Sequence, residues 1–253
     1  MSSVSVKVNS LSSKPYVDIL CYPSSDRKVA AQRVEELLQL GVSEVIFEGK
    51  TKIGRLGLLG KGCVSLVVKA KMNNRILALK IRRTDANRPS MHREAGLHRI
   101  ANQVDVGPKL HNVSDNFILL DLVIEDGIVD WIRNLKGLGS TARLRNVIQE
   151  VLSQAYKLDQ AGLDHGELSN LTKHVFVGDK VTIIDFETAS QNRRVSNVTS
   201  CVQNIFIGGP QASKVRRFLR LKNVEPIIDS IRKYKAERSV KIFESLLLDL
   251  KLI

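Results

Sequence analysis

The residues with the clearest chemical capacity are gathered between positions 163 and 187. In chain order, the side chains that could bind a metal ion or accept a proton are His165, Glu167, Asn170, His174 and Asp185. Carboxylate, carboxamide and imidazole groups are ligands that proteins offer to divalent cations, and such cations commonly bridge to phosphate oxygens. A carboxylate can also accept the proton of an attacking hydroxyl group. The segment therefore indicates metal-assisted phosphate chemistry.

A predicted hairpin would position these groups. Residues 175–177 and 181–184 are short apolar runs joined through Gly178-Asp179, a pattern typical of two antiparallel strands and a tight turn. The second run ends at Asp185. We therefore expect the hairpin to bring the loop carboxylate of Glu167 near the strand-end carboxylate of Asp185.

A second set of candidate residues lies upstream, on three predicted antiparallel strands at 55–59, 64–71 and 75–81. Gly60-Lys61-Gly62 is the first turn, and a glycine-rich turn allows backbone N–H groups to approach phosphate oxygens. Alternation along the third strand puts Ala78 and Lys80 on one face. Glu94, in the following helix, is a candidate ion-pair partner for Lys80. Taken singly, each feature is common, since strand-end lysines are usually solvated.

The glycine turn does not match the two common phosphate-binding motifs. A strand follows it where a dinucleotide-binding fingerprint requires a helix. No Gly-Lys-Ser/Thr opens a helix, so it is not a Walker A loop either.

The order of these features is more specific than any one of them. A glycine-rich strand turn, a strand lysine, a helix glutamate, a His-Gly-Glu loop after a long helix and an Ile-Ile-Asp-Phe strand end follow one another. In this order the chain resembles the protein-kinase-like superfamily over residues 56–187, and within it the small RIO-type kinases and their archaeal relatives. The resemblance implies an α+β, bilobal protein-kinase-like fold with a sheet-rich N-lobe and a helical C-lobe.

The resemblance also implies roles for individual residues. Gly60, Gly62 and Ser65 would lie over the ATP phosphates, and Val67 and Ala78 would lie against the adenine. Lys80 would bind the α- and β-phosphates, with Glu94 as its ion-pair partner. The hinge at 120–123, which includes Asp121 and Val123, would also bind ATP. Asp185 would bind Mg²⁺ or Mn²⁺. His165 and Glu167 would belong to the catalytic loop, with Glu167 accepting the hydroxyl proton.

The chain departs from the family pattern at three positions. Glu167 stands where the family has aspartate, and the side chain is one methylene longer. Thr172 replaces the asparagine that holds a second metal, so either Asn170 or His174 would take that role. Glu187 replaces the glycine of Asp-Phe-Gly.

The remaining segments complete an α+β pattern of strands first and helices later. We expect a strand-helix-strand extension over 1–50, in which 16–22 is an apolar run, 29–38 a helix and 42–48 a strand. A kinase N-lobe is expected over 51–124, with a helix from Asp85 or Asn87 to about Ala101 and a strand at 117–124. A reduced C-lobe is expected over 125–253, with a helix capped by Ser140 and a helical C-terminus broken at 208–210.

Composition limits the partners. The 253-residue chain has a net charge of +13, of which residues 191–253 contribute +8 from 13 Lys and Arg against 5 Asp and Glu. The alternatives are a solvated basic surface and a contact with nucleic acid or a ribonucleoprotein. Three widely spaced cysteines favour a reducing cytoplasm, and no apolar run approaches the ~18 residues of a membrane span.

Three functions follow as hypotheses. The first is an ATP-dependent serine/threonine protein kinase, with autophosphorylation included. The second is a nucleotide-binding scaffold or ATPase in which transfer to protein is vestigial. The third, a nucleic-acid-binding module alone, leaves the order of the motifs unexplained.

Overall fold

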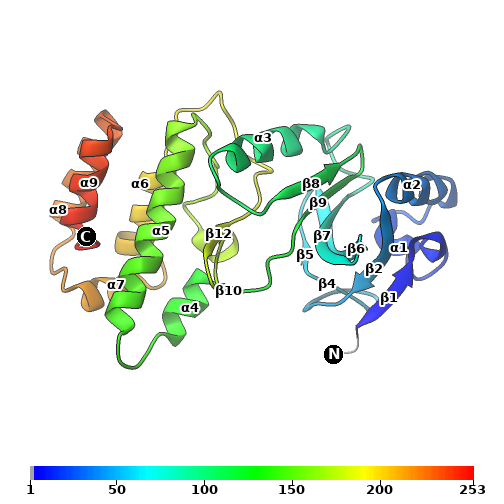
Figure 1. Cartoon of the computed structure of the whole chain (residues 1–253), viewed down its shortest axis with the longest axis horizontal. Helices are drawn as coiled ribbons and strands as arrows, with labels where there is room; N and C mark the ends of the chain where they lie inside the picture. The colour runs from blue at the N-terminus through cyan, green and yellow to red at the C-terminus, as the bar shows by residue number, and fades with distance from the viewer. Residues whose placement is uncertain (1–2) are drawn as a thin grey trace. The chain divides into compact units, whose positions relative to one another are not determined.

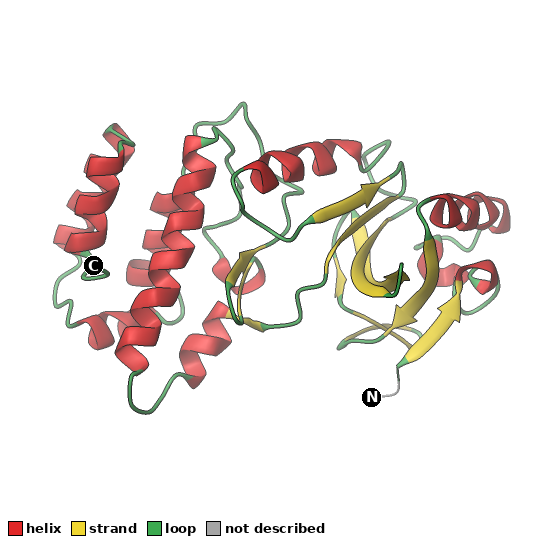
Figure 2. Ribbon diagram, in the orientation of Figure 1, coloured by secondary structure: helices red, strands yellow, loops and turns green. Residues whose placement is uncertain are grey.

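The computed structural model describes residues 3–253, which divide into two compact units. The first unit runs to Gly96 and includes Pro108–Val123, and the second comprises Leu97–Gly107 and Ile124–Ile253. Strands dominate the first unit and helices the second (Figure 2). The α+β class, with a sheet-rich N-terminal part and a helical C-terminal part, is confirmed.

The sheet-rich unit is built on one antiparallel sheet of seven strands (Figure 1). Their spatial order is β1 (Val4–Lys7), β2 (Val42–Phe47), β6 (Ser65–Met72), β7 (Arg75–Arg82), β9 (Phe117–Asp121) and β8 (Leu110–Val113), with β5 (Gly60–Lys61) also pairing with β6. The long β6–β7 hairpin turns at Asn73 and Asn74, both of which adopt positive φ. Asparagine tolerates this conformation, which suits a tight hairpin turn.

The two faces of this sheet differ in what covers them. Leu66, Leu79 and Leu119 point to the larger apolar cluster, which includes residues of the N-terminal segment. The opposite face carries a small cluster that contains Ile118 and Ala95. Buried residues between Val6 and Phe47 thus share a core with the strands that follow them.

The N-terminal segment contains a helical turn where the sequence suggested a strand. Residues 16–22 hold α1 (Val17–Leu20), while β1 is the strand that pairs with β2. Four helical residues are too few to show a helical period. Helix α2 (Arg27–Gln39) contains the expected helix at 29–38 and begins two residues earlier, because the Asp26 carboxylate accepts hydrogen bonds from the Lys28 and Val29 N–H groups.

Two other expectations for this unit are wrong in detail. The strand expected at 55–59 is β4 (Leu56–Leu58), but it pairs with β3 (Thr51–Ile53), and it is β5, in the expected turn, that pairs with β6. Helix α3 (His92–Gln103) begins at His92 and not at Asp85 or Asn87. Asp85 forms an ion pair with Arg83, and the Met91 N–H donates to the Asp115 carbonyl, so residues 85–91 form a fixed loop instead.

The helical unit surrounds the long helix α5 (Ser140–Gln160). The other elements are β10 (Asp126–Gly127), α4 (Ile128–Asn134), η2 (Leu171–Lys173), β11 (Val175–Val177), β12 (Val181–Ile183), α6 (Asn197–Val202), the π-helical η3 (Gln203–Gly208), α7 (Ala212–Leu219), α8 (Glu225–Ala236) and α9 (Val240–Asp249). Leu144, Ile148, Val151 and Leu158 of α5 are fully buried in its core. The expected hairpin is confirmed as β11–β12, and the C-terminal helices break at Gly208–Pro210 as predicted.

Ser140 does not cap α5 in the expected way. Gly139 occupies the position before the helix, in a left-handed conformation, and Ser140 is the first helical residue. Its hydroxyl donates to the Gly137 carbonyl at 2.7 Å. None of the described helices combines the length and apolarity needed to cross a bilayer.

Candidate functional site

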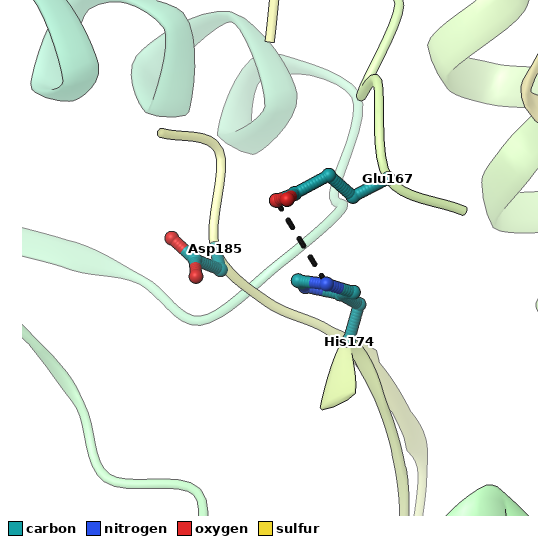
Figure 3. Close-up of side chains that lie close together, drawn as sticks. All are labelled: Glu167, His174 and Asp185. Atoms are coloured by element: carbon teal, nitrogen blue, oxygen red, sulfur yellow. Dashed lines mark ion pairs between the residues drawn. The ribbon is translucent and has the colours of Figure 1, made fainter. Parts of the chain in front are cut away.

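Three side chains of the helical unit lie close together (Figure 3). They are Glu167 from the loop after α5, His174 from the residue before β11 and Asp185 from the end of β12. One ligand atom of each lies within 4.8 Å of the others, and His174 Nε2 is 3.8 Å from Glu167 Oε2. We call this group the carboxylate–histidine cluster.

The hairpin sets the spacing between His174 and Asp185. The Ile184 N–H donates to the His174 carbonyl at 2.9 Å, which ties the two ends of the hairpin together. Asp185 follows directly and has a φ of +72°, in the left-handed region that asparagine and aspartate enter more readily than other side chains. A strained backbone at a candidate ligand is typical of functional sites.

Gly166 sets the position of Glu167. Its φ is +89°, and a Cβ atom there would lie 2.4 Å from Arg193 Nη2 and 3.1 Å from the Thr188 carbonyl oxygen. Only glycine fits both the conformation and the space. The glycine of the His-Gly-Glu sequence is therefore a structural requirement of this loop.

His165 supports the cluster from behind without reaching solvent. It is completely buried, and its Nε2 lies 3.0 Å from the Ile184 carbonyl oxygen, to which the ring N–H donates. Burial lowers the pKa of His165 to about 4, so the ring is neutral at pH 7. His165 was expected in a catalytic role. Its contacts make it a positioning residue for the strand end before Asp185.

The two residues that the sequence left as alternatives for one metal ligand have different contacts. The exposed Asn170 side chain accepts a hydrogen bond from the Thr172 N–H at 3.2 Å and caps η2. His174 lies close to Glu167 and Asp185.

Asp164, the nearest alternative proton acceptor, is fully engaged. Its carboxylate accepts from Arg193 Nε at 3.0 Å and from the Ser196 N–H at 3.1 Å, and the residue is 5% exposed. It anchors the loop after β12 to the loop that carries Glu167.

In the sheet-rich unit, Lys80 and Glu94 form a buried ion pair. The Nζ atom lies 2.5 Å from Glu94 Oε1, and the two residues are 7% and 3% exposed. Val67 pairs directly with Lys80 across β6 and β7, and Ala78 is two residues before Lys80 on the same face. Three residues predicted to meet a nucleotide thus share one sheet face.

The glycine turn is displaced by a few residues from its expected place. Gly60 lies in β5, and the turn itself is closed by the Gly62 N–H donating to the Ser65 carbonyl at 2.8 Å. Ser65 is buried at the start of β6. Gly60 therefore lies in the first strand of the β5–β6 hairpin, and Gly62 lies in its turn.

At the expected hinge, Asp121 ends β9 and Val123 follows it as the last residue of the sheet-rich unit. The Asp121 carboxylate lies 2.6 Å from His111 Nε2. This contact between β8 and β9 occupies the Asp121 side chain. Only backbone groups of Asp121 would then be available to contact a nucleotide.

Sequence reasoning missed the residues that hold Phe186, which follows Asp185. Phe186 is fully buried, with the His98 and His165 rings each 5.0 Å away, centroid to centroid. Gly107 has a φ of +84°, and a Cβ atom there would lie 2.9 Å from the Phe186 ring. The only sequence signal was the Gly107-Pro108 pair, which indicates a turn and no more.

A cavity of about 200 Å³ lies elsewhere in the helical unit, beside the start of β12. Its lining includes Glu150, Gln154, Lys157, Lys180 and Thr182. None of the three cluster residues lines it. We place the candidate site at the cluster, where the groups with metal-binding chemistry converge.

Comparison with known proteins gives a distant similarity. No protein-family model matches the chain. Over 95 residues the chain is 28% identical to the uncharacterized protein MJ1211 of Methanocaldococcus jannaschii, a stretch that covers 37% of this chain and 82% of that protein. The name of that protein assigns no activity.

Proposed function

We propose that the protein is an ATP-dependent phosphotransferase that passes the γ-phosphate to a serine or threonine hydroxyl of a protein. The observation that carries the proposal is the carboxylate–histidine cluster, in which two carboxylates and a buried imidazole converge. A divalent cation held by Glu167, His174 and Asp185 would bind phosphate oxygens and neutralise their charge.

The buried Lys80–Glu94 pair supports the same proposal. Removing two charges from water costs several kcal/mol per ion, so a buried pair is weak evidence of stabilisation. A lysine held rigidly by a glutamate is suited to presenting a fixed positive charge to a phosphate group. Val67 and Ala78, on the same face, are small enough to leave room beside it for an apolar ring.

Phosphoryl transfer from ATP depends more on the positioning of the reactants and on neutralising the phosphate charge than on proton transfer. The bond between the γ-phosphorus and its bridging oxygen breaks, and a new bond forms to the acceptor oxygen. The transition state of such transfers is loose in most analyses. The hydroxyl proton therefore leaves late and can pass to water as well as to a carboxylate.

The test is transfer of labelled phosphate from γ-labelled ATP with Mg²⁺ or Mn²⁺ present. We expect Lys80→Ala and Asp185→Asn to reduce transfer by at least about a hundredfold. Asparagine tolerates the left-handed conformation of Asp185, so this variant removes charge with little strain. Asp179→Asn, an exposed carboxylate at the hairpin turn, is the charge-matched control.

The outcomes separate the candidate functions. Label transfer that survives Asp185→Asn unchanged would exclude the assignment. Release of labelled phosphate to water without labelled protein would identify an ATPase, the alternative expected from the altered loop.

A further inference from the structure

We infer that Glu167, His174 and Asp185 form a one-nitrogen, two-carboxylate site that selects a first-row transition ion such as Mn²⁺ over Mg²⁺. Glu167 is then a metal ligand and not the proton acceptor. That the ion bridges ATP phosphates rests on the proposed function, whereas its identity depends only on the ligand set.

The donor atoms favour a transition ion. Mg²⁺ is bound almost entirely through oxygen, by carboxylates, phosphates and water. Imidazole nitrogen is a ligand of first-row transition ions, and the affinity of a given nitrogen- and oxygen-containing site generally rises from Mn²⁺ through Fe²⁺ to Co²⁺. His174 offers nitrogen where Asn170, had it joined the cluster, would have offered oxygen.

The position of His174 leaves its Nε2 available to a ligand. The residue is 7% exposed, its Nδ1 is buried, and within the described chain Nδ1 has no hydrogen-bond partner. Nε2 is the nitrogen that lies near Glu167, 3.8 Å from its Oε2 and therefore beyond hydrogen-bonding distance. A cation between these two atoms would give Nε2 a partner, while the buried Nδ1 would remain without one.

The spacing of His174 and Glu167 fits two ligands of one ion. Two ligand atoms that each lie about 2.1 Å from an ion can be separated by no more than roughly 4.2 Å. The 3.8 Å between His174 and Glu167 meets this limit, although it is too long for a direct hydrogen bond. The ligand atom of Asp185 lies within 4.8 Å of the other two, so a small shift of its side chain would complete the set. The Glu167 side chain is 39% exposed, which gives an ion a path from solvent.

The test compares Mn²⁺ and Mg²⁺ on the full-length protein without nucleotide. Mn²⁺ binding is followed by electron paramagnetic resonance, and Mg²⁺ affinity is obtained from competition. We expect one Mn²⁺ site. The affinity of this site for Mg²⁺, obtained from the competition, should be at least tenfold weaker than its affinity for Mn²⁺. In His174→Gln, a carboxamide oxygen reaches about as far as Nε2, so Mn²⁺ affinity should fall at least tenfold while Mg²⁺ affinity changes little.

Glu167→Gln separates the ligand role from the base role. A ligand carboxylate predicts at least a tenfold loss of Mn²⁺ affinity, whereas a base predicts unchanged affinity and slower transfer. Asp179→Asn should bind Mn²⁺ like the wild type, and circular dichroism should confirm that each variant is folded. Equal Mn²⁺ and Mg²⁺ affinities, or binding unaffected by both His174→Gln and Glu167→Gln, would overturn the inference.

The failure of this inference and of the proposed function can be told apart. Selective Mn²⁺ binding without phosphate transfer would reject the kinase and retain the site. Phosphate transfer that is as fast with Mg²⁺ as with Mn²⁺, and that His174→Gln does not change, would retain the kinase and reject the Mn²⁺-selective site.

Discussion

His174 illustrates how much information one side chain can carry. A buried polar group without a hydrogen bond costs about 1–3 kcal/mol, and folded proteins usually avoid that cost. In His174 the buried Nδ1 is unsatisfied, and the other ring nitrogen, Nε2, lies 3.8 Å from Glu167 Oε2. Sequence reasoning left His174 and Asn170 as equal alternatives because their distances in space depend on the short η2 turn. That turn uses the Asn170 side chain as its cap.

At the same scale, His165 predicts a pH dependence of stability. Burial lowers the pKa of His165 from 6.5 to about 4, so between these values the unfolded chain binds more protons than the native one. Its contribution is fully present above pH 6.5, is lost as the pH falls toward 4, and amounts to at most about 3 kcal/mol. We expect His165→Gln, which keeps a donor for the Ile184 carbonyl, to flatten the dependence in this window.

The measurement is the free energy of unfolding in urea from pH 4 to pH 7.5, with a chelator present. The comparison is the difference between His165→Gln and wild type at each pH. A constant difference across the range would mean that His165 is not the group responsible.

At the scale of elements, the loop before η2 places Glu167 through Gly166. Gly166→Ala would add a left-handed penalty of roughly 1–2 kcal/mol and a clash with Arg193 and the Thr188 carbonyl. Gly162 is a matched control, because its φ is +67° and no other residue lies near its missing Cβ. Both alanine variants should lose stability, but only Gly166→Ala should also lose Mn²⁺ affinity. Equal affinities in the two variants would show that Glu167 is not positioned by this loop.

The elements that sequence could predict are those with long or strongly patterned signals. The β11–β12 hairpin and α5 follow from apolar periodicity and from the Gly178-Asp179 pair. The short elements α1 and β5 could not be foreseen, since four and two residues show no period. The start of α3 was misplaced because Asp85 provides a helix-start signal, yet its carboxylate pairs with Arg83.

The candidate site was predictable in part for the same reason. The hairpin implied that Glu167 and Asp185 would approach, and strand alternation implied that Ala78 and Lys80 would share a face. Contacts between residues far apart in the chain could not be predicted from the sequence. The engagement of Asp164 by Arg193 depends on residues 29 positions apart.

At the scale of the whole molecule, about half of the Lys and Arg side chains after residue 190 form hydrogen bonds or ion pairs within the protein. Of the 13 Lys and Arg after residue 190, six donate to main-chain carbonyl oxygens. They are Arg193, Arg194, Lys214, Arg216, Arg238 and Lys251. Arg232 pairs with Asp229. Six cations are then not engaged in either way.

This count bounds any contact with nucleic acid, which we propose only as an added property. Each phosphate contact on a single strand contributes about −0.7 to the slope of log K against log salt. A filter-binding titration with generic RNA should therefore give a slope no steeper than about −4. A much steeper slope would mean that the cations bonded to carbonyl oxygens also contact phosphate. The absence of binding at low salt would exclude nucleic-acid binding.

The measurement that tests the account most directly is the affinity for ATP with and without Mn²⁺, determined by calorimetry. If the carboxylate–histidine cluster holds an ion that bridges phosphate oxygens, Mn²⁺ should tighten ATP binding at least tenfold in the wild type. The gain should disappear in Asp185→Asn and persist in Asp179→Asn. ATP binding that is equally tight with and without Mn²⁺, or a metal effect that Asp185→Asn leaves intact, would contradict the account.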